Sequence, residues 1–193
     1  MTTRPGQRSL FPFIPTVVSG SRRLAPAANQ PAHDLIMTPP ALARQIVDAF
    51  APKGRLLDPC RGNGAFYNAL RQHSEHVDWC EIGEGVDFFR YDRSVDWIIT
   101  NPPWSQFLPF LRHAMTIAPN IVFLATITHF VTKARLRAID AAGFGIPQVM
   151  LVEQPPKPWP GSGFQLAAVL VQRGAPWLFS RPIKVKPILW EVS

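Results

Sequence analysis

The chain has 193 residues, a length that allows one domain with short flanking arms. Hydrophobic residues make up 47% and charged residues 17%, a composition that excludes a disordered or fibrous protein. The formal net charge of +7 favours a polyanionic partner such as nucleic acid. No apolar run reaches the roughly 18 residues that a membrane-spanning helix needs, so we expect a cytoplasmic protein without membrane contact.

The excess positive charge gathers near both ends of the chain. We therefore expect a basic, proline-containing arm over residues 1–33, a folded domain over 34–173 and a basic tail over 174–193. Solvated charge and phosphate contacts explain such flanks equally well. The basic residues concerned are Arg4, Arg8, Arg22, Arg23, Arg181, Lys184 and Lys186.

Strands alternate with helices through the middle of the chain. Apolar residues at helical spacing, together with proline and glycine boundaries, predict helices at 41–50, 65–73, 105–118 and 133–142. Short apolar runs predict strands at 55–60, 77–82, 85–89, 95–100, 120–126, 146–153 and 164–172. This order predicts an α/β fold with a doubly wound, mainly parallel sheet, helices on both faces and a terminal antiparallel hairpin.

The first unusual motif, DPCRGNGAF at residues 58–66, joins a predicted strand to a predicted helix. Its glycines allow a sharp turn and a close approach of a ligand to the backbone, and Asp58 adds a carboxylate at the strand exit. Residue 67 is tyrosine, so the dinucleotide fingerprint G-x-G-x-x-G is absent. The turn therefore favours a nucleoside without a diphosphate, although a plain strand-to-helix connection would have the same pattern.

Acidic residues follow the next predicted strands. Glu81 stands where a carboxylate accepts hydrogen bonds from both hydroxyls of a ribose. Asp87 and Phe88 offer one polar acceptor and one apolar contact to an adenine ring. The two cysteines, Cys60 and Cys80, form neither a metal-ligand pattern nor a disulfide framework, so we interpret both as buried thiols and expect no metal site.

The second unusual motif, NPPW at residues 101–104, follows a buried strand. Two successive prolines fix the backbone and remove two N–H donors. The side-chain oxygen of Asn101 and the carbonyl of Pro102 then form two acceptors for the two hydrogens of an exocyclic amine, and Trp104 offers a stacking surface. A rigid turn ended by a core tryptophan is the alternative interpretation.

Together the two motifs resemble those of class I methyltransferases that use S-adenosylmethionine (AdoMet). DPCRGNGAF is similar to the cofactor motif D-P-x-x-G-x-G, and NPPW is similar to the N-P-P-[YFW] motif of amino-methyltransferases, above all the gamma-class N6-adenine DNA methyltransferases. Thr38-Pro39-Pro40 and the following helix match the family segment that precedes the cofactor motif. The resemblance covers about residues 34–173.

The resemblance implies a Rossmann-like domain that binds AdoMet. In the family, the threonine matching Thr38 contacts the cofactor carboxylate, the acidic residue matching Glu81 holds the ribose, and the pair matching Asp87 and Phe88 holds the adenine. The remaining positions implied around the cofactor are Asp58, Cys60, Gly62, Gly64 and Asn101.

The resemblance also implies methyl transfer to the N6 amine of adenine, with residues Asn101, Pro102, Pro103 and Trp104 as the catalytic motif. An aromatic amine is a poor nucleophile, and two acceptors on its hydrogens favour the pyramidal nitrogen that attacks the methyl group. In a duplex the base must leave the stack. Trp104 then stacks on it, and Trp159 and Phe164 are placed to cover its other face.

We expect DNA ahead of RNA as the substrate, with low sequence specificity. The family commonly adds a target-recognition domain, and the 20 residues after Arg173 are too few for one. The flanking arms or a partner subunit would then supply specificity, and the oligomeric state stays open. Two alternatives are a protein glutamine N5-methyltransferase, whose motif is similar, and a non-catalytic nucleic-acid-binding partner built on a methyltransferase fold.

Overall fold

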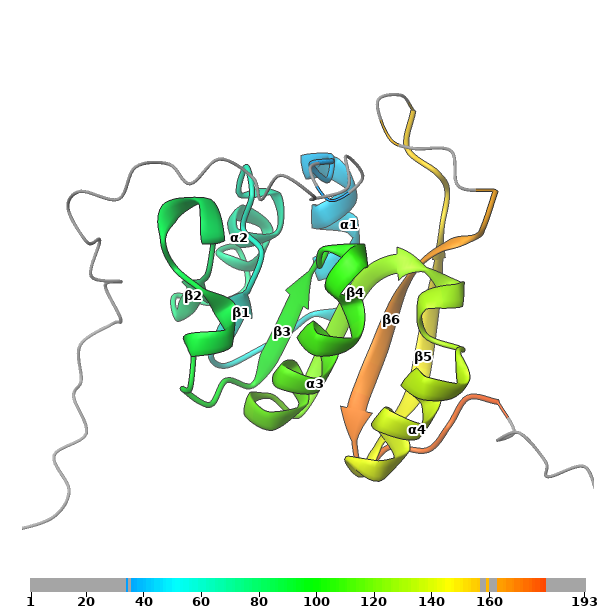
Figure 1. The fold of residues 1–193 in the computed structure, drawn as a ribbon. Coiled ribbons are helices and arrows are strands. Elements are labelled where there is room, and N and C mark those ends of the chain that lie inside the picture. Colours follow the sequence, from blue (N-terminus) through cyan, green and yellow to red (C-terminus); the bar gives the residue numbers. More distant parts are fainter. Residues whose placement is uncertain (1–33, 35, 157–158, 160–162, 180–193) are drawn as a thin grey trace, which may run out of the picture.

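A six-stranded sheet forms the centre of the molecule, which we describe from a computed structural model (Figure 1). The structure describes residues 34, 36–156, 159 and 163–179; the basic residues of the two flanks lie outside this part of the chain. The strand order is β2-β1-β3-β4-β6-β5. The strands are β1 (Leu56–Asp58), β2 (Val77–Trp79), β3 (Trp97–Thr100), β4 (Asn120–Thr126), β5 (Phe144–Val152) and β6 (Leu166–Arg173).

Strands β2, β1, β3 and β4 run parallel, whereas β6 is antiparallel to both β4 and β5. The chain builds outward from β1 to β2 and then returns to the other side of β1 to form β3. The strand order therefore reverses between β1 and β3, and ligands of such sheets bind beyond the carboxyl ends of strands at this point. This topology confirms the predicted mainly parallel sheet with a terminal hairpin.

Helices cover both faces of the sheet, as predicted. Alternate strand residues face opposite sides, so Ile98 packs with α3 and α4 while Ile99 packs with α1 and α2. In Figure 1, α3 and α4 lie over the face turned toward the viewer. The helices are α1 (Pro40–Phe50), α2 (Ala65–Leu70), α3 (Phe107–Ile117) and α4 (Lys133–Ala141).

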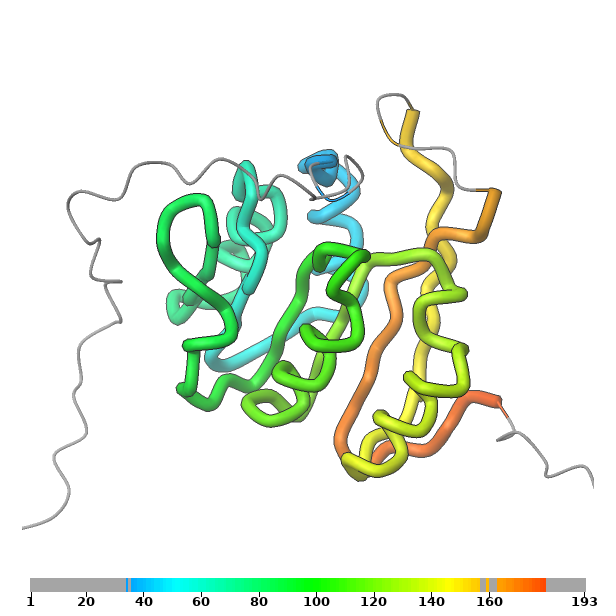
Figure 2. Tube along the Cα trace, in the orientation of Figure 1, coloured from blue at the N-terminus to red at the C-terminus, as the bar shows by residue number. Residues whose placement is uncertain are grey.

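Proline and backbone conformation set the limits of α1. Pro40 occupies the first helical position, where its missing N–H costs nothing. The helix ends at Phe50 because Ala51 adopts a left-handed conformation with φ of 44°. The apolar face of the helix, which includes Ile46 and Val47, is fully buried against the sheet. The start of α1, blue in Figure 2, lies toward the end of the sheet to which the β3 arrow points in Figure 1.

The predicted strand at 85–89 is wrong. Gly85 takes a left-handed conformation and Val86 turns back to form an isolated bridge with Glu81. The side chain of Asp87 then accepts the N–H of Phe89 and starts a short 3₁₀ helix, η3 (Phe88–Arg90). Two tight turns within five residues leave no extended stretch, so within the described residues the sheet ends at β2. Among these residues, none of the helices is long and apolar enough to cross a membrane.

Candidate functional site

The carboxyl ends of β1 and β3 lie side by side at the point where the strand order reverses. Asp58 is the last residue of β1, and Thr100 is the last residue of β3. The Thr100 hydroxyl donates a hydrogen bond of 2.8 Å to Asp58 Oδ1, and both side chains are fully buried. Because Asn101 follows Thr100 directly, this bond ties the two motifs of the sequence together.

Asp58 is a buried carboxyl group, and its two oxygens differ in their hydrogen bonding. Its Oδ1 also accepts the backbone N–H of Cys60 at 3.3 Å. Its Oδ2 is buried and has no hydrogen bond of normal geometry among the described residues. Burial raises the pKa of Asp58 to about 7, against the lowering effect of the Thr100 hydroxyl and nearby backbone groups. A cationic ligand beside Oδ2 would compensate this burial.

The glycine turn follows Asp58 and carries two left-handed residues, Gly62 with φ of 51° and Gly64 with φ of 88°. The backbone N–H of Gly62 donates to Glu81 Oε2 at 2.8 Å, which joins the turn to the end of β2. A side chain at either glycine would strain the backbone regardless of any ligand. These glycines therefore shape the turn, and replacing them would not test cofactor binding cleanly.

Arg61 fastens the glycine turn to β2. Its backbone N–H donates to the carbonyl of Cys80 at 3.0 Å. Its guanidinium lies 3.9 Å above the ring of Trp79 and forms an ion pair with Glu84. Cys80 is buried as predicted, whereas Cys60 is only half-buried. Burial raises the pKa of both thiols, with a further contribution from the nearby Asp58 carboxylate, so neither is a reactive thiolate at neutral pH.

Glu81 and Asp87 lie on successive turns beside this site. Each accepts a backbone N–H two residues further on: Gly83 at 3.0 Å for Glu81 and Phe89 at 2.9 Å for Asp87. Each carboxylate oxygen has two lone pairs, so Glu81 retains acceptor capacity for two hydroxyls. Both positions are thus compatible with the roles that the resemblance implies.

The ring of Phe88 lies in the core. Only 3% of the residue is exposed, and its ring packs against Phe110 at 5.0 Å and the ring of His113 at 4.7 Å. The Phe88 side chain therefore leaves little surface for contact with an adenine ring. Ile82 and Phe89, which sequence reasoning missed, are the exposed apolar side chains next to the two carboxylates, at 60% and 42% exposure.

The segment before α1 contacts the glycine turn and Ser105, the residue directly after the NPPW motif. Thr38 is buried at 5% exposure, two residues before the start of α1. The sulfur of Met37 lies so close to Gly62 that a β carbon there would approach it to 2.8 Å. The carboxylate of Asp34 accepts both the backbone N–H and the hydroxyl of Ser105. The contacts of Met37 and Asp34 depend on tertiary structure, so the sequence offered no signal for them.

The NPPW motif forms a rigid corner after β3. Pro102 is buried, while Asn101, Pro103 and Trp104 are half-buried. A short 3₁₀ helix, η4 (Trp104–Gln106), precedes α3, where the sequence predicted one continuous helix from residue 105. The indole N–H of Trp104 donates to Asn101 Oδ1 at 3.2 Å. The predicted catalytic side chains of the motif are thus in direct contact.

The other two predicted substrate contacts differ in exposure. Trp159 is 6% exposed and its ring meets that of Trp104 edge-on, with 6.5 Å between centroids. Phe164 is 60% exposed. The structure therefore brings Trp159 to the motif as part of the core, whereas Phe164, in the connection between β5 and β6, is mostly exposed.

His129 is a neighbour of the motif that sequence reasoning missed. It ends a short 3₁₀ helix, η5 (Ile127–His129), directly after β4, and its ring lies 5.2 Å from that of Trp104. Its Nδ1 lies 2.7 Å from Thr126 Oγ1. Burial, with the nearby Arg135 guanidinium, lowers the pKa of His129, so the ring is neutral at pH 7. No local sequence motif marks this residue.

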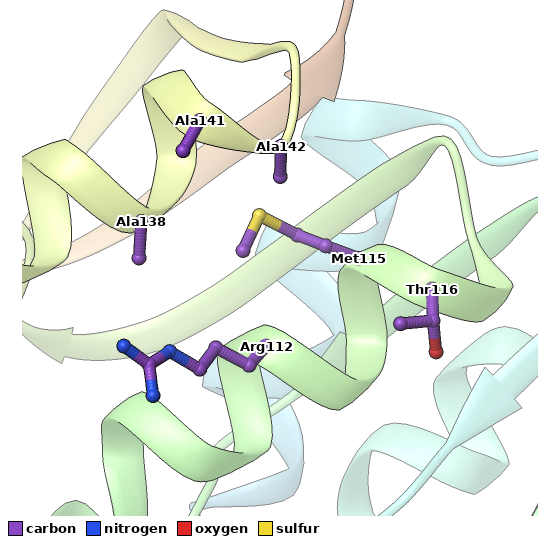
Figure 3. A pocket seen from close by; sticks show the side chains of 6 residues that line it. All are labelled: Arg112, Met115, Thr116, Ala138, Ala141 and Ala142. Atoms are coloured by element: carbon purple, nitrogen blue, oxygen red, sulfur yellow. The ribbon is translucent and has the colours of Figure 1, made fainter.

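A hollow lies between α3 and α4, away from the carboxyl ends of β1 and β3 (Figure 3). The backbone N–H of Val95 donates to the Ile117 carbonyl at 3.0 Å, which places the end of α3 beside the start of β3. The hollow is thus remote from Asn101 and does not belong to the candidate site. Its lining residues are Arg112, Met115, Thr116, Ala138, Ala141 and Ala142.

No family model matches the chain, and no curated protein matches it in sequence. Solved structures do match its fold. A protein from Pyrococcus horikoshii, assigned as an RNA methyltransferase, is 16% identical with a TM-score of 0.54, over 70% of this chain and 86% of that one. The 23S rRNA methyltransferase ErmE is 14% identical with a TM-score of 0.54, over 76% and 72%.

A third similar structure comes from Listeria monocytogenes and is assigned as a class I S-adenosylmethionine-dependent methyltransferase. It is 12% identical with a TM-score of 0.54, over 79% of this chain and 64% of that one. These likenesses, with the observed strand order, show that the chain has the Rossmann-like fold of class I methyltransferases. Within the described residues, no group of three His, Cys, Asp or Glu side chains could hold a metal ion.

Proposed function

We propose that the chain is an AdoMet-dependent methyltransferase that modifies the N6 amine of adenine in nucleic acid. The observation that carries this proposal is the hydrogen bond from Thr100 to Asp58, which holds a cofactor motif and an amine-binding motif together at the reversal of the strand order. Ligands of this fold bind at that point. The structure thus supports a cofactor and an acceptor amine as neighbours.

The residues at the end of β1 fit AdoMet. The cofactor carries an α-ammonium group, and the buried Oδ2 of Asp58 lacks a hydrogen bond of normal geometry among the described residues. Glu81 offers acceptors for the ribose hydroxyls from the end of β2. Ile82 and Phe89 offer apolar surface for the adenine, with the Asp87 carboxylate between them in sequence. When bound, AdoMet supplies an electrophilic methyl group on a sulfonium.

The residues at the end of β3 fit an aromatic amine. Asn101 Oδ1 and the Pro102 carbonyl accept the two N–H bonds and localise the lone pair on nitrogen. With AdoMet held at the end of β1, these two acceptors would direct the amine lone pair toward its methyl group. Transfer would leave the electron pair of the broken carbon–sulfur bond on sulfur, and the product amine would release one proton to water. The rings of Trp104 and Phe164 provide stacking surfaces for the base.

The acceptor class rests on charge as well as on the motif. A net charge of +7 suits a polyanion, and the exposed Lys133 and Arg137 add cations one helical turn apart on α4. We place DNA ahead of RNA because the motif resembles DNA enzymes most. The names of two similar structures refer to RNA, so RNA belongs in the same test.

The test is a transfer assay with methyl-labelled AdoMet. The chain is incubated with single-stranded DNA, duplex DNA, RNA and a glutamine-containing release factor, and label is counted in each. We expect label in nucleic acid and, after digestion, in N6-methyladenosine or its deoxy form. Label in the protein alone would favour the glutamine alternative. Binding of DNA without any label in a chain that also fails to bind AdoMet would favour the non-catalytic alternative.

A second experiment tests low sequence specificity and the basic flanks. Binding through phosphates weakens steeply as salt increases. Deleting residues 1–30 removes Arg4, Arg8, Arg22 and Arg23, so the salt dependence of DNA affinity should become shallower. An unchanged slope would remove the N-terminal arm from the interface. Methylation of one defined duplex, with none on scrambled adenine-containing DNA, would contradict low specificity.

A further inference from the structure

The indole N–H of Trp104 forms a shared hydrogen bond in the NPPW corner. It donates to Asn101 Oδ1 at 3.2 Å and also lies 3.4 Å from the carbonyl oxygen of Leu124, in the middle of β4. Such three-centre bonds are common where two acceptors lie on one side of a donor. The indole thus connects the end of β3 to the neighbouring strand.

This donor is specific to tryptophan. A phenylalanine at the same position has no polar hydrogen, and the hydroxyl of a tyrosine lies at the far tip of its ring. The chain therefore has a hydrogen bond at the amide of Asn101 that the other aromatic residues accepted by the motif do not supply from this place. In the proposed function, the same oxygen accepts a hydrogen bond from the N–H of the substrate amine.

The side-chain amide of asparagine has two ends of similar shape, an oxygen that accepts and a nitrogen that donates. Rotating the Asn101 amide by half a turn would point its NH₂ group at the indole N–H, and two donors would then face each other. The indole N–H therefore selects the amide orientation in which Asn101 Oδ1, and not the NH₂ group, faces the indole. Because the oxygen has two lone pairs, it can accept the indole N–H and a substrate amine at once.

The indole itself is held on several sides. Its ring lies 5.2 Å from the neutral ring of His129 and 6.5 Å from that of the buried Trp159. The carbonyl of Leu124 belongs to a fully buried strand residue. The Trp104 indole is thus held by contacts from β4, η5 and the β5–β6 connection. A donor held in this way keeps the Asn101 amide in one orientation before substrate binds, as electrostatic preorganisation requires.

We propose that Trp104 is a positioning residue that acts through Asn101, holding the amide oxygen toward the reacting amine. This inference rests on the proposed function and deepens it, because it gives Trp104 a role in rate in addition to stacking. Losing a neutral hydrogen bond of this kind should slow methyl transfer about three- to tenfold. The affinity for AdoMet should not change, because the indole is placed against the acceptor half of the site.

The experiment removes the N–H while keeping the ring. Benzothienylalanine at position 104, which has sulfur in place of the indole N–H, preserves the shape of the side chain, and Trp104→Phe is the simpler companion. Single-turnover rates are measured for each, alone and combined with Asn101→Ala. Trp97→Phe is the matched control, since Trp97 begins the strand whose other end carries Asn101. We expect benzothienylalanine to slow transfer in the native background and to have no further effect beside Asn101→Ala. Trp104→Phe also reduces the stacking surface, so it should slow transfer in both backgrounds, and more in the native one.

A second readout does not depend on activity. In a chain labelled with ¹⁵N-tryptophan, the indole proton of Trp104 should shift and exchange faster in Asn101→Ala, and stay unchanged in Trp97→Phe. Additive kinetic effects of benzothienylalanine and Asn101→Ala, or an indole resonance that does not change in Asn101→Ala, would overturn the positioning role. A native chain that labels no acceptor at all would instead overturn the proposed function and remove the catalytic part of the inference. The two failures are therefore distinguishable.

Discussion

The ends of β1 and β3 lie side by side, but they are formed by different types of residue. At the end of β1 there is a glycine turn with two carboxyl groups beside it. Asp58 is buried next to the turn, and Glu81 accepts the Gly62 N–H. Residues 100–104 at the end of β3 carry no charged side chain. They form a rigid proline corner whose amide, Asn101, is tied to an indole. The difference suggests that one end selects and holds a cationic cofactor, while the other places neutral acceptors around a reacting amine.

Asn101→Ala should have the largest effect and tests whether the end of β3 serves the acceptor amine and not the cofactor. Its side chain serves the acceptor amine in our account, and removing one such group costs on the order of 3 kcal/mol, or about a hundredfold in rate. We expect a loss of that size in single-turnover methyl transfer with unchanged AdoMet affinity by calorimetry. A rate within about threefold of the native value would take Asn101 out of the reaction.

Glu81→Gln should give the opposite pattern. A charged acceptor for two ribose hydroxyls contributes about 1.5–3 kcal/mol, so AdoMet affinity should fall about tenfold or more. The substitution also weakens the bond from Gly62, so a thermal melt must show that the variant is folded. Native affinity in a folded variant would mean that the cofactor does not lie against the end of β2.

Titration of Asp58 also tests whether the cofactor binds at the end of β1, because its effect on AdoMet affinity varies continuously with pH. With a pKa of about 7, this carboxyl is mostly protonated below neutrality in the free chain. Since an ammonium group binds the carboxylate, AdoMet affinity should fall about tenfold from about pH 8 to about pH 6. Calorimetry at several pH values measures this, and Asp58→Asn should bind weakly at all of them. An affinity independent of pH would separate Asp58 from the cofactor.

The raised pKa of Asp58 also predicts how stability depends on pH. The folded chain holds this proton more tightly than the unfolded chain, in which the pKa is near 3.8. Its contribution to stability is therefore fully present below about pH 4 and is lost as the pH rises through about 7. Urea unfolding at several pH values should show this decline in the native chain, and a smaller one in Asp58→Asn.

The smallest expected effect concerns the exposed apolar surface beside Glu81. Ile82→Ser removes a side chain that is 60% exposed and that would cover the cofactor adenine. Burial of that surface is worth about 1 kcal/mol, so affinity should fall about fivefold with no change in melting temperature. Leu151→Ser on β5, where the residue is 63% exposed, is the matched control and should leave affinity unchanged.

Much of the fold was predictable because its signals are local. The helix from Pro40 and the strand before Asn101 follow from proline boundaries and apolar runs. The strand expected at 85–89 failed for a local reason too. Gly85 and Asp87 encode two successive turns, but the apolar residues between and after them imitate a strand.

The candidate site was predictable in its motifs and not in its contacts. Asp58 and Asn101 stand out because strand ends carry ligands in this kind of sheet. The neighbours His129 and Asp34 have no motif of their own and reach the site only through tertiary folding. The burial of Trp159 likewise depends on packing against distant residues, so its position in the sequence could not distinguish a core ring from a substrate contact.

The most direct test of the division between the two strand ends is rescue by cofactor concentration. Single-turnover methyl transfer is measured for Glu81→Gln and Asn101→Ala as AdoMet is raised from limiting to saturating. We expect the rate of Glu81→Gln to recover toward the native value, since only AdoMet binding is impaired. The rate of Asn101→Ala should stay about a hundredfold low at every concentration. Recovery of Asn101→Ala, or a Glu81→Gln variant that stays slow at saturation, would contradict the account.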